Sequence, residues 1–229
     1  MKQVLDEVLA AIDWRALGDV YFHEAGEAEL RERQPRIVEL GAELGSALGR
    51  RLPRGGRSLW VGAGIGELPA LLAEVLEHGR EVVATNLRGA ECDILNRALA
   101  AAGQSSSLVY RAVDAREVAA AGAFDHVGCV SLFTDPETWP LLSDVAYGRI
   151  APVQLDVERF AAEREDARGL ARALFDALAR PGWITTSAEE APWFLEQATL
   201  VGASYDADDE LVETAIVGDP VGFLQILEA

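Results

Sequence analysis

The residues best suited to chemistry in this sequence are three glycines that follow a short apolar run. Gly62, Gly64 and Gly66 alternate with small or apolar residues, and helical spacing resumes after Glu67. Glycine adopts positive φ angles easily and lacks a Cβ, so its backbone can approach a ligand closely. The first turn of a following helix adds free N–H groups. This pattern predicts a strand, a tight turn and a helix start that bind a nucleotide-like cofactor.

The spacing of these glycines discriminates between cofactors. A dinucleotide-binding turn needs Gly-x-Gly-x-x-Gly or Ala, but Glu67 or Pro69 stands at the last position, depending on whether the count begins at Gly62 or Gly64. The stretch also lacks the Gly-Lys-Ser/Thr ending of the phosphate loop of NTPases. The sequence therefore disfavours NAD, FAD and nucleoside triphosphates. A glycine-rich turn without a ligand, in another kind of α/β domain, is the alternative interpretation.

Apolar runs and helical patterns alternate along the chain. We expect strands at 57–61, 81–85, 107–113, 124–132 and 181–187. We expect helices between them at 66–79, 88–102 and 158–180. This alternation predicts a mostly parallel sheet with helices on both faces and a ligand at the carboxyl ends of the strands. Three apolar segments near the C-terminus predict antiparallel strands at the sheet edge: 199–204, 211–217 and 222–227.

Two further segments surround this pattern. Residues 1–56 contain amphipathic helical stretches and predict an N-terminal helical extension, so that the α/β domain comprises residues 57–229. Residues 134–157 match no element firmly. Because loops of this length often act as lids or bind substrates, we expect this segment to be such an insertion.

The glycine turn and the order of the later elements resemble a known family. Gly-x-Gly-x-Gly after a first strand is similar to motif I of class I S-adenosylmethionine (SAM)-dependent methyltransferases, and Pro181-Gly182 before the fifth strand is similar to a step that the family also has. The resemblance covers residues 57–229. It implies a Rossmann-like methyltransferase fold, SAM as the cofactor and a SAM-dependent methyltransferase activity.

The resemblance also implies cofactor-binding positions. Gly62, Gly64 and Gly66 would form the turn against SAM, and Asn86 follows the second strand, where the family usually has an acid that holds the ribose hydroxyls. After the third strand, Asp114 would accept a hydrogen bond from the adenine amino group, and the N–H of Ala115 would meet a ring nitrogen. The alternatives are a turn residue at Asn86 and a helix N-cap at Asp114.

Two residues depart from the family pattern. Asn86 replaces a carboxylate, and an amide accepts a hydroxyl without the assistance of charge. Trp60 stands two residues before the first glycine, where the family usually has an acid that orients the amino-acid end of the cofactor. Glu67 or Tyr21 could compensate. These replacements keep open a non-catalytic binding or regulatory protein on the same fold.

The sequence assigns no catalytic group. His23, His126 and Asp135 are candidates for a base, although His126 lies within an apolar strand pattern and fits a packed residue better. Methyl transfer needs alignment and desolvation more than acid or base chemistry, because the cofactor supplies the electrophile. Cys92 and Cys129 lack metal-ligand spacing, so we expect reduced, packed thiols and no metal.

Charge and composition limit the partners. The formal net charge of −18 disfavours nucleic acid and anionic membranes as partners. The run from Ser131 to Glu137 lacks the Asn/Asp-Pro-Pro-Tyr sequence of amino-methylating nucleic-acid enzymes, and no apolar run reaches membrane-spanning length. We therefore expect a cytoplasmic enzyme with a small-molecule acceptor and, less readily, a protein acceptor. Another adenosyl-cofactor enzyme, such as an aminopropyl transferase or a synthase, is a further alternative.

Overall fold

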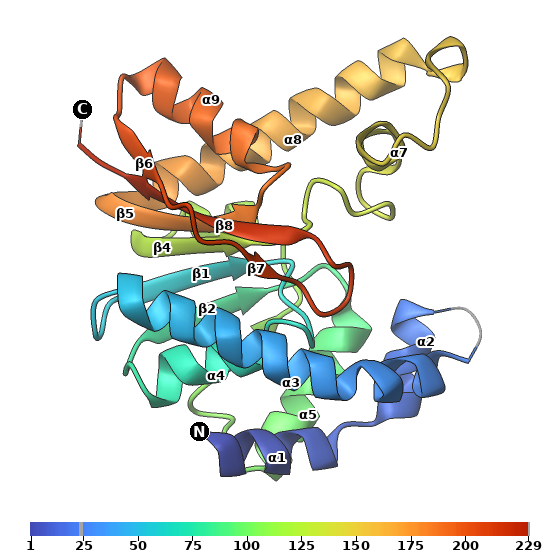
Figure 1. Ribbon diagram of the computed structural model, residues 1–229, viewed down its shortest axis with the longest axis vertical. Coiled ribbons are helices and arrows are strands. Elements are labelled where there is room, and N and C mark those ends of the chain that lie inside the picture. Colours follow the sequence, from blue (N-terminus) through green and yellow to red (C-terminus); the bar gives the residue numbers. More distant parts are fainter. Residues whose placement is uncertain (23–24, 229) are drawn as a thin grey trace.

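The computed structural model describes residues 1–22 and 25–228, and its centre is one mixed sheet (Figure 1). The strands are β1 (Arg57–Val61), β2 (Glu81–Thr85), β3 (Tyr110–Arg111), β4 (Phe124–Cys129), β5 (Leu178–Ser187), β6 (Tyr205–Ala207), β7 (Val212–Glu213) and β8 (Pro220–Ile226). Their order is β3-β2-β1-β4-β5-β8-β6, and β7 also pairs with β8. The first five strands are parallel, and β8 runs antiparallel to β5. The predicted mostly parallel sheet with an antiparallel C-terminal edge is confirmed.

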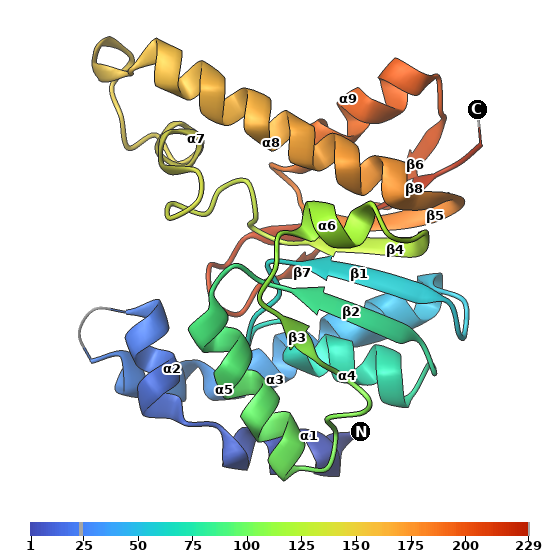
Figure 2. The ribbon, with the colours of Figure 1, turned by 180° about the vertical axis from the view of Figure 1, so that it is seen from behind.

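Helices cover both faces of this sheet (Figures 1 and 2). The helices are α1 (Lys2–Ala11), α2 (Trp14–Tyr21), α3 (Gly26–Arg51), α4 (Leu68–Leu76), α5 (Gly89–Ala101), α6 (Ala115–Ala119), α7 (Pro140–Ala146), α8 (Val157–Ala177) and α9 (Ala191–Val201). Apolar residues of α1 to α5 pack on one face of the sheet around Trp60. Residues of α6, α8 and α9 pack on the other face around Leu59 and Val61. The alternation of side chains along β1 therefore serves two separate cores.

Several predicted boundaries differ from the structure, chiefly near the C-terminus. Residues 199–201 end α9, whereas we expected a strand at 199–204. Phe194, Gln197 and Ala198 are the buried residues of this helix, and their helical spacing outweighs the strand propensity of the Thr-Leu-Val run. The strands at 107–113 and 211–217 shorten to two residues each, because turns close around them. Helix α8 ends at 177, and β5 begins at once at 178.

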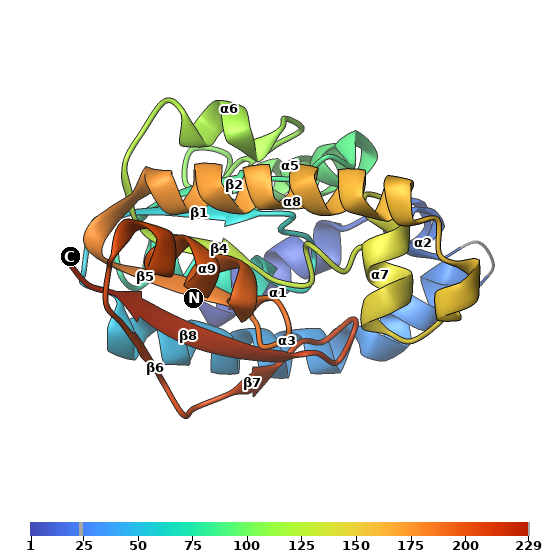
Figure 3. The same cartoon turned by 90° about the horizontal axis from the view of Figure 1, so that it is seen from above.

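The segment 134–157 contains α7 and a short 3₁₀ helix at Pro152–Gln154. Together with the first turns of α8, it projects beyond the carboxyl ends of the strands, and α2 flanks the same end of the molecule (Figure 3). Within the described residues, no helix combines the length and the apolar character needed to cross a membrane. The main consequence for function is that two helical arms flank the end of the sheet where a ligand is expected.

Candidate functional site

A cavity of about 790 Å³ lies at the carboxyl ends of the parallel strands. Such a volume is typical of small-molecule sites, which measure roughly 300–1,000 Å³. The residues around it come from α2, the loops after β1, β2, β3 and β4, the arm that carries α7, and the loop before β8. They include Tyr21, Gly62, Gly66, Glu67, Asn86, Arg88, Asp114, Ala115, Arg116, Ser131, Thr134, Trp139, Tyr147, Arg149 and Ile216.

The glycine turn contributes to the cavity through its first and last glycines. Gly62 has φ +69°, which only glycine adopts without strain. A Cβ on Gly66 would touch Ile216 at 3.5 Å, an ordinary contact distance, so the missing side chain leaves space on the cavity wall. A Cβ on Gly64 would lie 2.4 Å from the Tyr21 hydroxyl and from a carboxylate oxygen of Glu91. The missing side chain of Gly64 therefore makes room for Tyr21 and Glu91, and Gly64 itself does not line the cavity.

Two carboxylates hold the backbone of this turn. The Gly64 N–H donates to Glu67 at 2.8 Å, and the Ile65 N–H donates to Glu91 at 3.2 Å. Burial raises the pKa of Glu67 above its usual value, while the Gly64 N–H opposes that shift. Glu67 also lines the cavity, where it could compensate for the missing acid at position 60.

Asn86 lies at the end of β2, as predicted, and it is both a turn residue and part of the cavity wall. Its side-chain oxygen accepts a hydrogen bond from the Arg88 N–H at 2.8 Å. Its amide nitrogen donates to the carbonyl of Ala63 at 3.0 Å and to Glu91 at 3.2 Å. The turn function that we considered as an alternative is present, and it leaves the side chain at the cavity.

Asp114 and Ala115 lie at the start of α6, after β3, and both line the cavity. Asp114 is the N-cap, and its side chain accepts from the Arg116 N–H at 2.8 Å. The Arg116 guanidinium also pairs with Asp114 at 3.0 Å and with Asp166 of α8 at 2.8 Å. The predicted helix cap is thus confirmed, in a place where the same residue can face a ligand.

The loop after β4 is joined to the loop after β2. Arg88 pairs with Asp135 and with Glu137, each at 2.9 Å. Asp135, a candidate base, is therefore already engaged by a cation. Glu190, which follows β5, accepts hydrogen bonds from two N–H groups of the loop after β4, those of Phe133 at 2.6 Å and Thr134 at 3.2 Å. These contacts fix the part of the cavity wall that the loop after β4 forms.

Ser131, at the end of β4, has an unusual backbone conformation for its type. Its φ is +51°, a region that non-glycine residues adopt at a cost. Its hydroxyl donates to Asp219 at 2.7 Å, and Tyr147 donates to the same carboxylate at 3.0 Å. Strained residues cluster at ligand sites, and this one lines the cavity.

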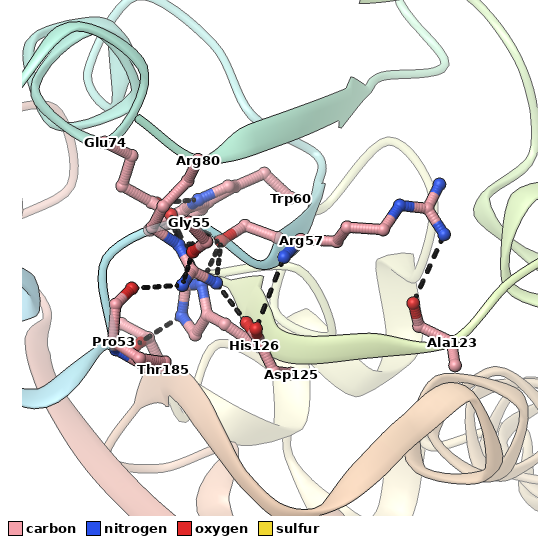
Figure 4. Close-up of polar contacts among 11 residues, drawn as sticks. Pro53, Gly55, Arg57, Trp60, Glu74, Arg80, Ala123, Asp125, His126 and Thr185 are labelled. Carbon is pink, nitrogen blue, oxygen red and sulfur yellow. Dashed lines mark hydrogen bonds and ion pairs between the residues drawn. The ribbon is translucent and has the colours of Figure 1, made fainter. Parts of the chain in front are cut away.

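Trp60 of β1 and His126 of β4 belong to a buried polar network, and neither residue lines the cavity (Figure 4). The Trp60 indole donates to Glu74 at 2.6 Å, and the same carboxylate pairs with Arg80 at 3.0 Å. His126 contacts the hydroxyls of Ser58 and Thr185. Burial, with help from Arg80, lowers the pKa of His126 to about 3, so its imidazole is neutral. His126 is thus a packed structural residue, as its strand pattern indicated.

The remaining candidates have separate outcomes. His23 lies outside the described residues. Cys92 and Cys129 are free thiols, both buried, as predicted.

Tyr21 and Glu91 form a contact that sequence spacing could not reveal, because they are 70 residues apart: the Tyr21 hydroxyl donates to Glu91 at 2.5 Å. Burial raises the pKa of Glu91 to about 7, and the Tyr21 hydrogen bond acts against this shift.

Comparison with solved structures identifies the architecture. Precorrin-6y C5,15-methyltransferase from Geobacter metallireducens matches 83% of this chain and 88% of its own, with a TM-score of 0.51 and 14% identity. TrmN from Thermus thermophilus matches 82% of this chain with a TM-score of 0.50 and 17% identity, and this chain spans about half of its length, 48%. The chain has the class I methyltransferase fold. In this fold, the predicted cofactor positions 62, 66, 86, 114 and 115 meet at one cavity.

The likeness is one of structure and not of sequence. No protein-family model matches the chain, and no curated protein matches it significantly. At such low identity the two solved structures establish the class I methyltransferase fold alone, and the chemistry has to be argued from the site.

Proposed function

We propose that this chain is a SAM-dependent methyltransferase that acts on a small-molecule acceptor. The observation that carries the proposal is the convergence of Gly62, Gly66, Asn86, Asp114 and Ala115 on one cavity at the carboxyl ends of the strands. These residues come from three separate loops; the glycines were selected from the sequence by their spacing, and the other three positions were implied by the family resemblance. In open α/β sheets, ligands bind at this place.

The chemistry of the wall fits the parts of SAM. The open space beside Gly66 accommodates an approaching ligand. The Asn86 oxygen can accept a hydrogen bond from a hydroxyl in addition to the one from the Arg88 N–H. Ala115 is the first residue of α6, so its N–H has no partner within the helix and is suited to an adenine nitrogen. The bound cofactor would supply an electrophilic methyl group. The protein's contribution is to align the acceptor and exclude water.

The size and surroundings of the cavity support a small acceptor. The arm with α7 contributes Trp139, Tyr147 and Arg149 to the wall. A cavity of about 790 Å³ has room for a cofactor and a small molecule. The net charge of −18 opposes a nucleic-acid acceptor.

The same wall disfavours a polyamine acceptor, and with it the aminopropyl transferase alternative. A polyamine needs carboxylates that are free to pair with its ammonium groups. Here Asp135 and Glu137 pair with Arg88, and Asp114 and Asp166 pair with Arg116. The four acids share two arginines, so an ammonium group would have to compete with a guanidinium for each of them.

Transfer of a labelled methyl group tests the proposal. The protein is incubated with SAM that carries an isotopically labelled methyl group and with a cell extract divided into a low-molecular-mass fraction and a macromolecular fraction. We expect label in the low-molecular-mass fraction, and none with a Gly66→Leu variant that fills the cavity. Label confined to protein or RNA would contradict the acceptor class.

A non-catalytic binding protein on the same fold is the second candidate. The observations in its favour are the Trp60 indole, engaged with Glu74 in the buried network, and the amide in place of an acid at Asn86. This candidate predicts that S-adenosylhomocysteine binds while no fraction of the extract is labelled.

A further inference from the structure

The hydrogen bonds of Asn86 fix which end of its amide is the acceptor. Its Nδ2 faces two acceptors, the Ala63 carbonyl and the Glu91 carboxylate, and its Oδ1 faces the Arg88 N–H. A flipped amide would place an oxygen against two oxygens and an NH₂ group against an N–H. The neighbours of Asn86 therefore keep Oδ1 as an acceptor.

The same neighbours disfavour a carboxylate at position 86. An aspartate there would direct one oxygen at the Ala63 carbonyl and at the Glu91 carboxylate, which repel it. Asn86 is 7% exposed and Glu91 is fully buried, so water would do little to screen the repulsion. Positions 86 and 91 together therefore favour a single carboxylate, and in this chain that carboxylate is Glu91.

Glu91 is held from two other directions. One of its oxygens accepts from Tyr21 of α2 at 2.5 Å and from the Ile65 N–H of the glycine turn at 3.2 Å. The other oxygen accepts from Asn86. A single buried carboxylate thus connects the N-terminal helices, the glycine turn and the end of β2.

We infer that Glu91 is the positioning residue for ribose recognition by Asn86, and that Tyr21 makes the N-terminal helix α2 part of the cofactor site. The inference rests on the proposed function, because it takes the ligand to be an adenosyl compound. In this arrangement the amide of Asn86 lines the cavity, and the carboxylate of Glu91 lies behind it. Glu91 does not accept a hydrogen bond from the ribose itself; it orients Asn86 so that Oδ1 faces a ribose hydroxyl.

An exchange of the two side chains tests this pair. The affinity for S-adenosylhomocysteine is measured by calorimetric titration of the wild type, Asn86→Asp, Glu91→Gln and the double variant Asn86→Asp/Glu91→Gln. Each single change should weaken binding roughly threefold to tenfold, because it removes or misdirects one hydrogen bond. The double variant should recover an affinity within about threefold of the wild type, since an aspartate acceptor then meets an amide donor.

A matched control uses the amide of Asn96, which lies on the helix that carries Glu91. Asn96 of α5 also spans a backbone donor and a backbone acceptor, the N–H and the carbonyl of Tyr110, each at 2.8 Å. Asn96→Asp introduces a comparable repulsion, between the new carboxylate and the Tyr110 carbonyl. Asn96 makes no hydrogen bond to Glu91, so Glu91→Gln cannot relieve this repulsion. Adding Glu91→Gln to Asn96→Asp should therefore give additive effects and no recovery.

Tyr21→Phe tests the contribution of α2. Loss of its hydroxyl should weaken S-adenosylhomocysteine binding roughly threefold to tenfold in the wild type. It should have a smaller effect in the Glu91→Gln variant, in which the carboxylate partner is gone.

The outcomes separate the two proposals. Failure of the wild type to bind S-adenosylhomocysteine would overturn the proposed function and the ribose assignment together. Binding by the wild type, with strictly additive losses in the double variant, would overturn this inference and leave the proposed function standing. Unchanged affinity in Glu91→Gln would also overturn it.

Discussion

The carboxylate of Glu190, after β5, lies 2.6 Å from the amide nitrogen of Phe133, after β4. It also accepts the N–H of Thr134. Two loops at the carboxyl end of the sheet are thereby joined through a buried acid that is only 1% exposed. The contact holds Thr134, which lines the cavity, in place.

Glu190→Ala should lower the free energy of unfolding by about 2–4 kcal/mol, because each buried N–H left without a partner costs about 1–3 kcal/mol. Glu190→Gln keeps an acceptor oxygen and should stay within about 1 kcal/mol of the wild type at pH 7. Urea denaturation of both variants measures the difference. Equal losses in the two variants would show that the acceptor is unimportant.

The same acid predicts a pH dependence of stability. Burial raises the pKa of Glu190 to about 8, against an ordinary value of 4.5. Between these two pH values the folded chain holds a proton that the unfolded chain has lost, so stability falls as pH rises from about 4.5 to about 8. Compared with Glu190→Gln, the wild type should lose on the order of a few kcal/mol over this interval. A difference in unfolding free energy that is constant from pH 5.5 to 8.5 would contradict the prediction.

Asp114 should serve both α6 and the ligand. Asp114→Ala should cost about 1 kcal/mol of stability through loss of the N-cap and should also weaken binding of S-adenosylhomocysteine. Asp156 is a matched control, since its side chain caps α8 through the Arg159 N–H at 3.0 Å and it does not line the cavity. Asp156→Ala should lose similar stability and retain affinity. Equal affinities in both variants would reduce Asp114 to a helix cap.

Gly66 allows a methyl group to be added to the cavity wall at little cost to folding. Its φ is not positive, and the new Cβ would meet Ile216 at 3.5 Å. Gly66→Ala should therefore keep or slightly raise the melting temperature while it lowers the affinity for S-adenosylhomocysteine. Gly169→Ala, in open space on α8, is the control that should raise stability alone. Unchanged affinity in Gly66→Ala would place the ligand elsewhere.

Local patterns, together with the family resemblance, explain why much of the proposed site could be predicted. The glycine turn, Asn86 after a strand and Asp114 before a helix each depend on residues within a few positions, and the parallel sheet brings their strand ends together. The predicted strand at 199–204 was wrong because packing against α8 and β8 determines the conformation of α9. A run of six residues contains little information about such packing.

Long-range polar contacts could not be predicted. Tyr21 meets Glu91 across 70 residues, and Glu190 meets Phe133 across 57. Neither acid stands in a recognisable motif, and a glutamate in a helix or loop is usually a solvated residue. Trp60 was marked as a departure from the family pattern, but its partner Glu74 became visible only in the folded chain.

The most direct test of the account is a calorimetric titration of the purified protein with SAM, S-adenosylhomocysteine and NAD, with Gly66→Leu as the cavity-filled control. The account predicts micromolar binding of both adenosyl compounds, no binding of NAD, and at least a tenfold loss of affinity, about 1.4 kcal/mol, in the variant. Absence of binding by either adenosyl compound, or equal binding by Gly66→Leu, would contradict the assignment of the cavity as a SAM site.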